Sequence, residues 1–201
     1  MKLYIHFCAF GFSNCYVLGD KNEAVIIDPG SMDKAVLSSI EDNEYKLAGV
    51  LITHNHPNHV HGLTTLKRIY NTDIYSLSPV IQEYKSILVR NGETIQLGSF
   101  NIETFSVPGH SVDSAVFKID RMLFTGDALT AGLIGKTSSI YGTVNQMTAL
   151  RSRILSLPGD YSVFPGHGPP TNLDAERRFN AGINDYETYQ IRRIRFRPEF
   201  D

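Results

Sequence analysis

The segment Thr53-His54-Asn55-His56-Pro57-Asn58-His59-Val60-His61-Gly62 determines how this chain is interpreted, because it holds four of the seven histidines. Imidazole is the commonest metal-ligating side chain in proteins, and it suits Zn, Fe, Cu and Ni. Pro57 disfavours the α conformation at His56, so the chain is expected to be extended there. In an extended chain, residues i and i+2 point to one side, so His54 and His56 can converge on one metal ion. His59 follows the bend and can address a second point nearby.

The composition is that of an ordinary globular protein. With 201 residues, 42% of them hydrophobic and 20% charged, the chain is long enough for one domain with a full core. Residues 1–201 are therefore predicted to form a single domain. The formal net charge of −2 gives no bias toward nucleic acid or a membrane surface, so neither is expected as a partner.

The expected location is the cytoplasm. The N-terminal residues carry no long apolar core of the kind found in a signal peptide, and no apolar run reaches the length of a membrane span. The two cysteines, Cys8 and Cys15, form neither a CxxC motif nor a disulfide framework. A reducing compartment is the usual setting for such a chain, and both thiols are predicted to be small buried side chains.

Turn residues divide the chain into short apolar segments whose periodicity distinguishes strands from helices. In the first half the predicted strands are 2–8, 14–18, 23–28 and 47–53, and the predicted helices are 33–42 and 63–70. In the second half the predicted strands are 94–97, 100–107, 115–119, 122–125 and 161–164, and the predicted helices are 144–157 and 173–180. Both halves run from strands to a helix, which favours two packed sheets covered by helices.

Three further polar residues lie in glycine-containing turns directly after predicted strands. His110 lies in Val107-Pro108-Gly109-His110-Ser111, Asp127 follows Phe124-Thr125-Gly126, and His167 follows Phe164-Pro165-Gly166. Loops at strand ends, held by a rigid scaffold, are where binding and catalytic residues concentrate. These three residues are therefore candidate partners for the histidine segment.

In this order, the segments resemble the metallo-β-lactamase superfamily, whose defining motif is HxHxDH followed by a His, a metal-bridging Asp and a final His. The resemblance runs from Asn14 to Glu176. It is nearest the short glyoxalase II-like (hydroxyacylglutathione hydrolase-like) branch, through Phe124-Thr125-Gly126-Asp127-Ala128-Leu129 and Pro165-Gly166-His167-Gly168-Pro169-Pro170-Thr171. It implies an α+β fold, a four-layer αββα sandwich of two mixed β-sheets flanked by helices.

The resemblance also implies a set of site residues. His54, His56 and His110 would bind a first metal ion, His59 and His167 a second, and Asp127 would bridge the two. Zinc is the first expectation, and iron or manganese would accept the same ligands. For three further residues around the ligands, a role in the site and a purely structural role are both open. Asp28 and His61 are predicted to support the ligands from behind, the alternatives being a turn-forming Asp and a surface His, and Lys136 is predicted near a substrate carboxylate, or else on the surface.

Asn58 stands where the superfamily motif has its Asp. Asn is neutral, and its amide oxygen is a weaker metal donor than a carboxylate, which can also orient the attacking water and take its proton. The centre is therefore predicted to be asymmetric, with a well-filled first site and a weaker second site. The competing interpretation is that Asn58 is mainly the N-cap of the next helix.

The predicted function is hydrolysis of a thioester, or of a related ester or lactone, by a metal-bound hydroxide, because a bound metal lowers the pKa of water and polarises a carbonyl. The substrate is expected to be a small molecule, with a glutathione-type thioester as the model. One alternative is a mononuclear non-haem iron enzyme similar to persulfide dioxygenases, which uses two histidines and one carboxylate. A further alternative is a metal-binding homologue whose catalysis is impaired by Asn58.

The C-terminal residues 186–201 are predicted to form a basic arm, since arginines alternate with Ile194 and Phe196. A solvated edge, an anion-binding arm and a contact across a homodimer are all consistent with this pattern. Longer glyoxalase II proteins carry a C-terminal helical domain that binds glutathione. No equivalent of that domain is expected after His167.

Overall fold

The computed structural model describes residues 1–184, which build two six-stranded β-sheets packed face to face. The predicted basic arm at 186–201 lies outside the described residues. In the first sheet, the order is β1 (Lys2–Cys8), β2 (Ser13–Asp20), β3 (Glu23–Ile27), β4 (Lys46–Leu51), β5 (Ile74–Ser76) and β8 (Ile87–Leu88). Strands β1, β2 and β3 pair antiparallel, and β3, β4, β5 and β8 pair parallel, so the sheet is mixed.

The second sheet is also mixed. Its order is β16 (Thr171–Asn172), β15 (Ser162–Pro165), β12 (Met122–Gly126), β11 (Ala115–Ile119), β10 (Phe100–Ser106) and β9 (Thr94–Leu97). Only the pair β12 and β15 is parallel among the pairings of this sheet in the described part of the chain. Two small hairpins complete the strands: β6 (Val80–Ile81) with β7 (Tyr84–Lys85), and β13 (Leu129–Thr130) with β14 (Leu133–Ile134).

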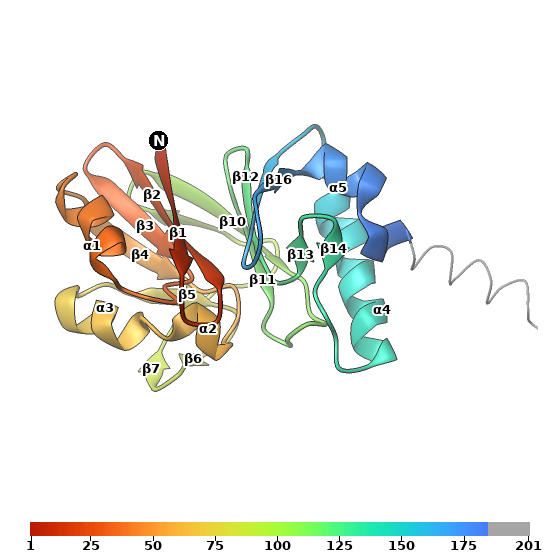
Figure 1. The fold of residues 1–201 in the computed structure, drawn as a ribbon, viewed down its shortest axis with the longest axis horizontal. Coiled ribbons are helices and arrows are strands. Elements are labelled where there is room, and N and C mark those ends of the chain that lie inside the picture. Colours follow the sequence, from red (N-terminus) through yellow and green to blue (C-terminus); the bar gives the residue numbers. More distant parts are fainter. Residues whose placement is uncertain (185–201) are drawn as a thin grey trace, which may run out of the picture.

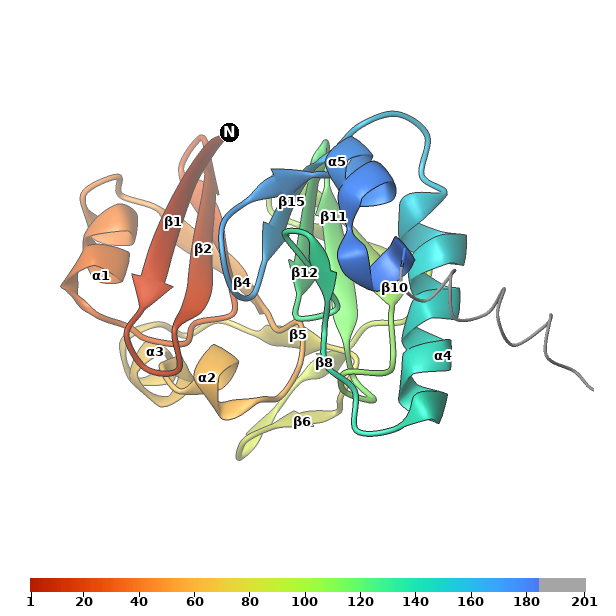
Figure 2. The same ribbon diagram turned by 45° about the vertical axis from the view of Figure 1, so that its right-hand side comes forward.

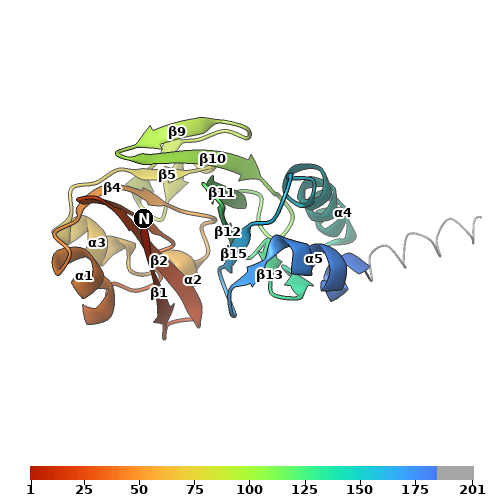
Figure 3. The ribbon, with the colours of Figure 1, turned by 90° about the horizontal axis from the view of Figure 1, so that it is seen from above.

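Helices cover the outer face of each sheet, which gives the four layers seen in Figures 1 and 3. On the first sheet lie α1 (Lys34–Glu41), α2 (Pro57–Val60) and α3 (Leu63–Ile69). On the second lie α4 (Ile140–Ala149), the π-helical segment η1 (Leu150–Leu155) and α5 (Leu173–Phe179). The predicted α+β, αββα architecture is therefore confirmed.

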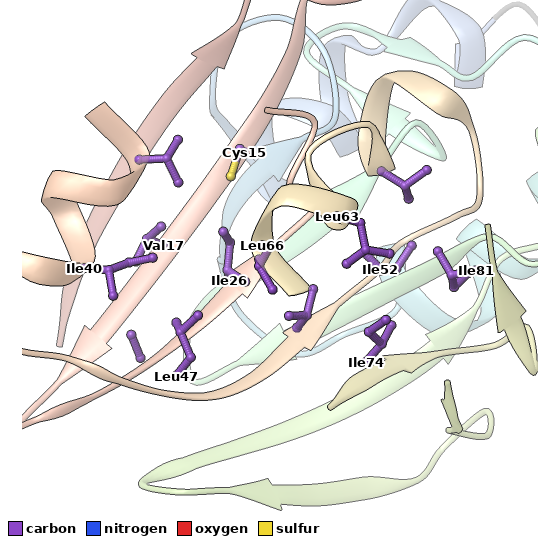
Figure 4. Packing of buried hydrophobic residues seen from close by; sticks show 14 of the residues in the cluster. Cys15, Val17, Ile26, Ile40, Leu47, Ile52, Leu63, Leu66, Ile74 and Ile81 are labelled. Carbon is purple, nitrogen blue, oxygen red and sulfur yellow. The ribbon is translucent and has the colours of Figure 1, made fainter. Parts of the chain in front are cut away.

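Three hydrophobic clusters fill the spaces between the four layers. The first, shown in Figure 4, joins the first sheet to its helices through side chains such as Ile26, Ile40 and Leu66. The second lies between the sheets and includes Tyr16, Phe117 and Phe124, and the third joins the second sheet to α4, η1 and α5. Cys8 and Cys15 are fully buried free thiols in the first cluster, as predicted from the sequence.

The structure corrects the predicted helix 144–157. Helix α4 begins at Ile140, because the Ser139 hydroxyl accepts a hydrogen bond from the Gly142 amide and so caps an earlier turn. The α-helix ends at Ala149, and the rest of the predicted range continues as π-helix to Leu155. Hydrophobic periodicity alone indicated neither the early cap nor the change in helix type.

No helix within residues 1–184 combines the length and the apolar character needed to cross a bilayer.

Candidate metal centre

The six predicted ligands meet at one end of the two sheets, and each follows the end of a strand. His54 and His56 lie between β4 and α2, and His59 lies in α2. His110 follows β10, Asp127 directly follows β12, and His167 follows β15. The donor atoms of the six predicted ligands form two groups within 4.8 Å: His54, His56, His110 and Asp127 in one, and His59, Asp127 and His167 in the other. Both of these groups contain Asp127, which is the position expected of a bridging carboxylate. A third group of the same kind joins Asp28 to His54 and His59.

The first group has the spacing of a tetrahedral metal site. His110 Nε2 lies 3.1 Å from His56 Nδ1 and 3.5 Å from Asp127 Oδ2, and His54 Nε2 lies 3.8 Å from the same oxygen. Donors held at about 2.0–2.2 Å from a tetrahedral ion are roughly 3.3–3.6 Å apart. These four side chains therefore fit one divalent ion with little rearrangement.

The second group is less complete. His59 Nε2 lies 3.3 Å from Asp127 Oδ1, and His167 Nε2 lies 3.5 Å from Asp127 Oδ2. The Asn58 amide nitrogen lies 2.7 Å from His167 Nε2. Asn58 thus meets the ring nitrogen that a second ion would use, and it brings no negative charge to that place.

Three of the donor atoms are buried and lack a hydrogen-bond partner among the described residues: His54 Nε2, His59 Nε2 and Asp127 Oδ1. A buried polar atom left unsatisfied costs about 1–3 kcal/mol. Three such atoms, spread over the two adjoining donor groups that share Asp127, would be costly unless something satisfied them. A divalent cation does this, so the donor set fits a bound metal.

The Nδ1 atoms of four ligand rings are held from behind, which leaves each Nε2 free to face the centre. The partners are Thr53 Oγ1 at 3.1 Å from His54, Asp28 Oδ2 at 3.0 Å from His59, Lys136 O at 2.8 Å from His110, and Phe12 O at 2.9 Å from His167. An acceptor at Nδ1 keeps the proton on that nitrogen and fixes the ring orientation. His56 is the exception, since its Nδ1 faces the centre.

Asp28 supports two of the ligands at once. Its Oδ1 accepts from the Thr53 amide at 2.8 Å, and its Oδ2 accepts from the Thr53 hydroxyl at 2.6 Å and faces His59 Nδ1. The Thr53 hydroxyl in turn meets His54 Nδ1. Asp28 therefore lies behind the ligands, where the sequence placed it, and Thr53 is an additional member of this network. The sequence signal for Thr53 was its position directly before His54.

Replacing Thr53 with valine is expected to weaken metal binding by about 10- to 100-fold, the usual effect of losing a partner of a ligating histidine. Valine keeps the shape of threonine but removes the hydroxyl that joins Asp28 to His54. Competition with a chromophoric chelator measures the affinity. Thr53→Ser is the control, because it restores the hydroxyl and should restore binding. Equal affinities of the valine and wild-type proteins would contradict the role given to this hydroxyl.

The protonation states differ between the two groups. Burial, and then the neighbouring His59, lowers the pKa of His54 to about 3, and burial and His110 lower the pKa of His56, so both rings are neutral at pH 7 and able to bind metal. Burial opposes a charge on His59, but the neighbouring carboxylates of Asp127 and Asp28 outweigh it and raise the pKa of His59 to about 10. Burial likewise opposes ionisation of Asp127, and the interaction with His59 outweighs it, so the pKa of Asp127 falls to about 2.

Two residues of β2 hold the His167 loop and were not singled out from the sequence. Asn14 donates from Nδ2 to the carbonyls of Pro165 (3.0 Å) and Gly168 (2.8 Å), and the Tyr16 hydroxyl donates to Pro165 (2.5 Å). Both side chains therefore tie a loop of the second sheet to a strand of the first. Their signal was present in Asn14-Cys15-Tyr16-Val17, where the family resemblance begins.

Gly166 leaves the space that the centre needs. A Cβ at this position would lie 2.4 Å from Asp127 Oδ1 and 2.5 Å from His59 Cε1. Any side chain would therefore displace one of two ligands.

The structure bears on three residues for which the sequence left alternatives open. Asn58 is not a helix N-cap, because Pro57 takes the first helical position and His56, with φ −86° and ψ 143°, becomes the cap. His61 is exposed and stacks on Phe10, with ring centroids 4.1 Å apart, rather than lying behind a ligand. Lys136 meets His110 through its backbone carbonyl, and its side chain is exposed.

Comparisons with known proteins agree with this geometry. The chain is 28% identical to a probable metallo-hydrolase from Streptococcus pyogenes, over 90% of this chain and 89% of that protein. It is 32% identical to a hydroxyacylglutathione hydrolase from Francisella tularensis, over 76% of this chain but only 61% of that protein. A crystal structure of the B3 metallo-β-lactamase BLEG-1 superposes with a TM-score of 0.82 at 25% identity, covering 90% of this chain and 99% of that one.

The family model for the metallo-beta-lactamase superfamily matches residues 8–167, a range that begins at the end of β1 and ends at the last predicted ligand. The matched range includes every residue of the two donor groups. The chain belongs to the metallo-β-lactamase superfamily.

Proposed function

We propose that this protein is a metal-dependent hydrolase that acts on a thioester or on a related ester or lactone. The observation that supports it most directly is that His54 Nε2, His59 Nε2 and Asp127 Oδ1 are buried without a hydrogen-bond partner in two donor groups that share Asp127. Relatives named as a metallo-hydrolase and as hydroxyacylglutathione hydrolase support the reaction class. The chain spans only 61% of the hydroxyacylglutathione hydrolase, so we do not assign the thiol part of that enzyme's substrate to this protein.

A divalent ion bound by His54, His56, His110 and Asp127 would supply water of lowered pKa and would polarise a substrate carbonyl. The protein residues then have separate tasks. Asp127 is ionised at neutral pH, so it can accept a hydrogen bond from the attacking water and orient the water's lone pair toward the carbonyl carbon. Asn58 can hydrogen-bond to the same water, but it cannot take its proton, which should slow the reaction relative to a carboxylate.

We propose zinc as the metal, held mainly in the first site, with iron or manganese as alternatives that the same donors accept. One observation favours a second candidate function, an oxygenase with a single iron. The first group offers histidines and one carboxylate to one ion, while the neutral amide of Asn58 lies 2.7 Å from His167 Nε2 in the second group. A one-metal enzyme is compatible with that arrangement.

The test is metal analysis followed by activity. Protein purified without added metal and treated with a mild chelator is expected to retain about one equivalent of metal, as measured by mass spectrometry. Complete removal of the remaining ion with a strong chelator should abolish hydrolysis of a thioester panel, measured as release of free thiol, and reconstitution with zinc, iron or manganese should restore it.

Two tightly held equivalents would contradict the asymmetric centre. Oxygen consumption with glutathione persulfide, seen only with iron and without thioester hydrolysis, would replace the hydrolase with the oxygenase. Removal of all metal with no change in thioester hydrolysis would overturn both proposals.

A further inference from the structure

Three phenylalanines are exposed on the β1–β2 hairpin, two of them, Phe7 and Phe12, with neighbouring rings. Phe7 is 63% exposed, Phe10 47% and Phe12 68%. We call these three residues the aromatic lip. Large apolar side chains exposed together on one loop usually mark a place where something binds.

The lip belongs to the rim of the metal centre. The Phe12 carbonyl accepts the hydrogen bond from His167 Nδ1, so the hairpin tip directly holds a ligand. The neighbouring Gly11 packs on Asn58, where an added Cβ would lie 2.4 Å from the Asn58 Cβ. Phe10 stacks on His61, which lies two residues after His59. In Figures 1 and 2 the tip of this hairpin lies beside α2, which carries Asn58 and His59.

Strand register places Phe7 on the same side. Phe7 pairs with Asn14 across β1 and β2, so both side chains point to one face of the sheet. Asn14 uses that face to hold the His167 loop through Pro165 and Gly168. Phe7 is therefore on the side of the hairpin that faces His167, and its ring lies 6.0 Å from that of Phe12.

The chemistry of the hairpin identifies what the lip would contact. From Leu3 to Gly19 the sequence contains no Lys, Arg, Asp or Glu. A surface without cations offers nothing to the carboxylates of a glutathione-type thiol, whereas exposed phenyl rings gain free energy by covering hydrocarbon.

We infer that the aromatic lip binds the apolar acyl chain of the substrate, so that the preferred substrates are thioesters or lactones with acyl chains of several carbons. This inference rests on the proposed function, since it names the substrate class of the same site. The lip residues determine specificity and do not touch the reacting atoms.

The test uses N-acetylcysteamine thioesters with acyl chains from acetyl to decanoyl, because this thiol is small and uncharged. For the metal-loaded wild-type protein, kcat/KM is expected to rise about two- to fourfold for each added methylene over the first several carbons. In the double variant Phe7→Ser/Phe12→Ser this dependence should flatten, which is measured as a fall in the ratio of kcat/KM for the octanoyl thioester to kcat/KM for the acetyl thioester. Phe179→Ser, which changes an equally exposed ring on α5, is the matched control and should keep the wild-type dependence.

A binding measurement separates this inference from the proposed function. Calorimetry with the non-hydrolysable S-octyl and S-ethyl thioethers of N-acetylcysteamine should show at least about tenfold tighter binding of the octyl compound, lost in Phe7→Ser/Phe12→Ser. This result would support the lip even if no thioester were hydrolysed. Equal binding of the two thioethers, or an unchanged preference in the double variant, would overturn the inference. A wild-type dimer that the double variant converts to monomer would also overturn it, by assigning the lip to a second copy of the chain.

Discussion

Replacing Asp127 with asparagine is expected to remove both tightly bound metal and hydrolytic activity, with kcat/KM falling by about 10³-fold or more. Asp127 lies within 3.3 to 3.8 Å of the Nε2 atoms of four histidines. It also supplies the only carboxylate in the first donor group identified among the described residues. Loss of a bound Lewis acid removes several kcal/mol of transition-state stabilisation, which corresponds to about three orders of magnitude.

The measurements for Asp127→Asn are metal content by mass spectrometry and steady-state hydrolysis of the thioester panel. Asp120→Asn is the matched control, because Asp120 is exposed in the β11–β12 turn at φ 51°, a conformation that asparagine adopts readily. The control should retain metal and activity. A variant at Asp127 that kept a full equivalent of metal would show that the ion is held elsewhere.

Replacing Asn58 with aspartate is expected to create a tight second metal site, with affinity there rising by about 10- to 100-fold, or about 1.4–2.8 kcal/mol. The substitution conserves shape and adds one negative charge beside His167 Nε2, where the amide nitrogen now lies at 2.7 Å. The position also tolerates a carboxylate, since it is in the first turn of α2, where negative charge is favourable. Thioester hydrolysis should rise at least about tenfold, because a carboxylate can take the proton of the attacking water.

Asn55→Asp is the control for Asn58→Asp, since it adds the same charge to the same segment at an exposed position. It should bind one equivalent and hydrolyse at the wild-type rate. If Asn58→Asp gained a second metal ion without any gain in hydrolysis, the protein would be better described as a binding protein. If it gained neither, Asn58 would not be the residue that limits the second site.

The grouping of the candidate ligands could be predicted from the sequence because most of them follow buried apolar strands. Strands such as β4 and β12 are specified by continuous hydrophobic runs, and the polar residue that follows each run is carried to the same end of the sheets. The family resemblance then assigned His110, Asp127 and His167 to one centre with the histidine segment. The order of the four layers could be predicted from the same hydrophobic runs, because each half of the chain consists of strands followed by a helix.

The residues that sequence reasoning did not find act through contacts that no local pattern encodes. Asn14 holds a loop more than 150 positions away in the sequence. Lys136 holds the His110 ring through its backbone carbonyl, a contact that any residue at this position could make. For His61 the sequence left open a place behind the ligands or on the surface, and in the structure it follows a one-turn helix and stacks on Phe10 at the surface. The helix cap fell on His56 instead of Asn58 because proline occupies the first helical position. Each of these outcomes depends on tertiary packing or on one backbone angle.

The candidate metal donors come from both sheets, so they are synthesised at different times. His54, His56 and His59 leave the ribosome first, while His110, Asp127 and His167 emerge later and belong to the opposite sheet. A nascent chain that ends before Asp127 has imidazoles but no shared carboxylate to neutralise a cation. The first donor group is therefore complete only once β12 has brought Asp127 beside the histidines, and the second group needs β15 beside β12 as well, because β15 delivers His167.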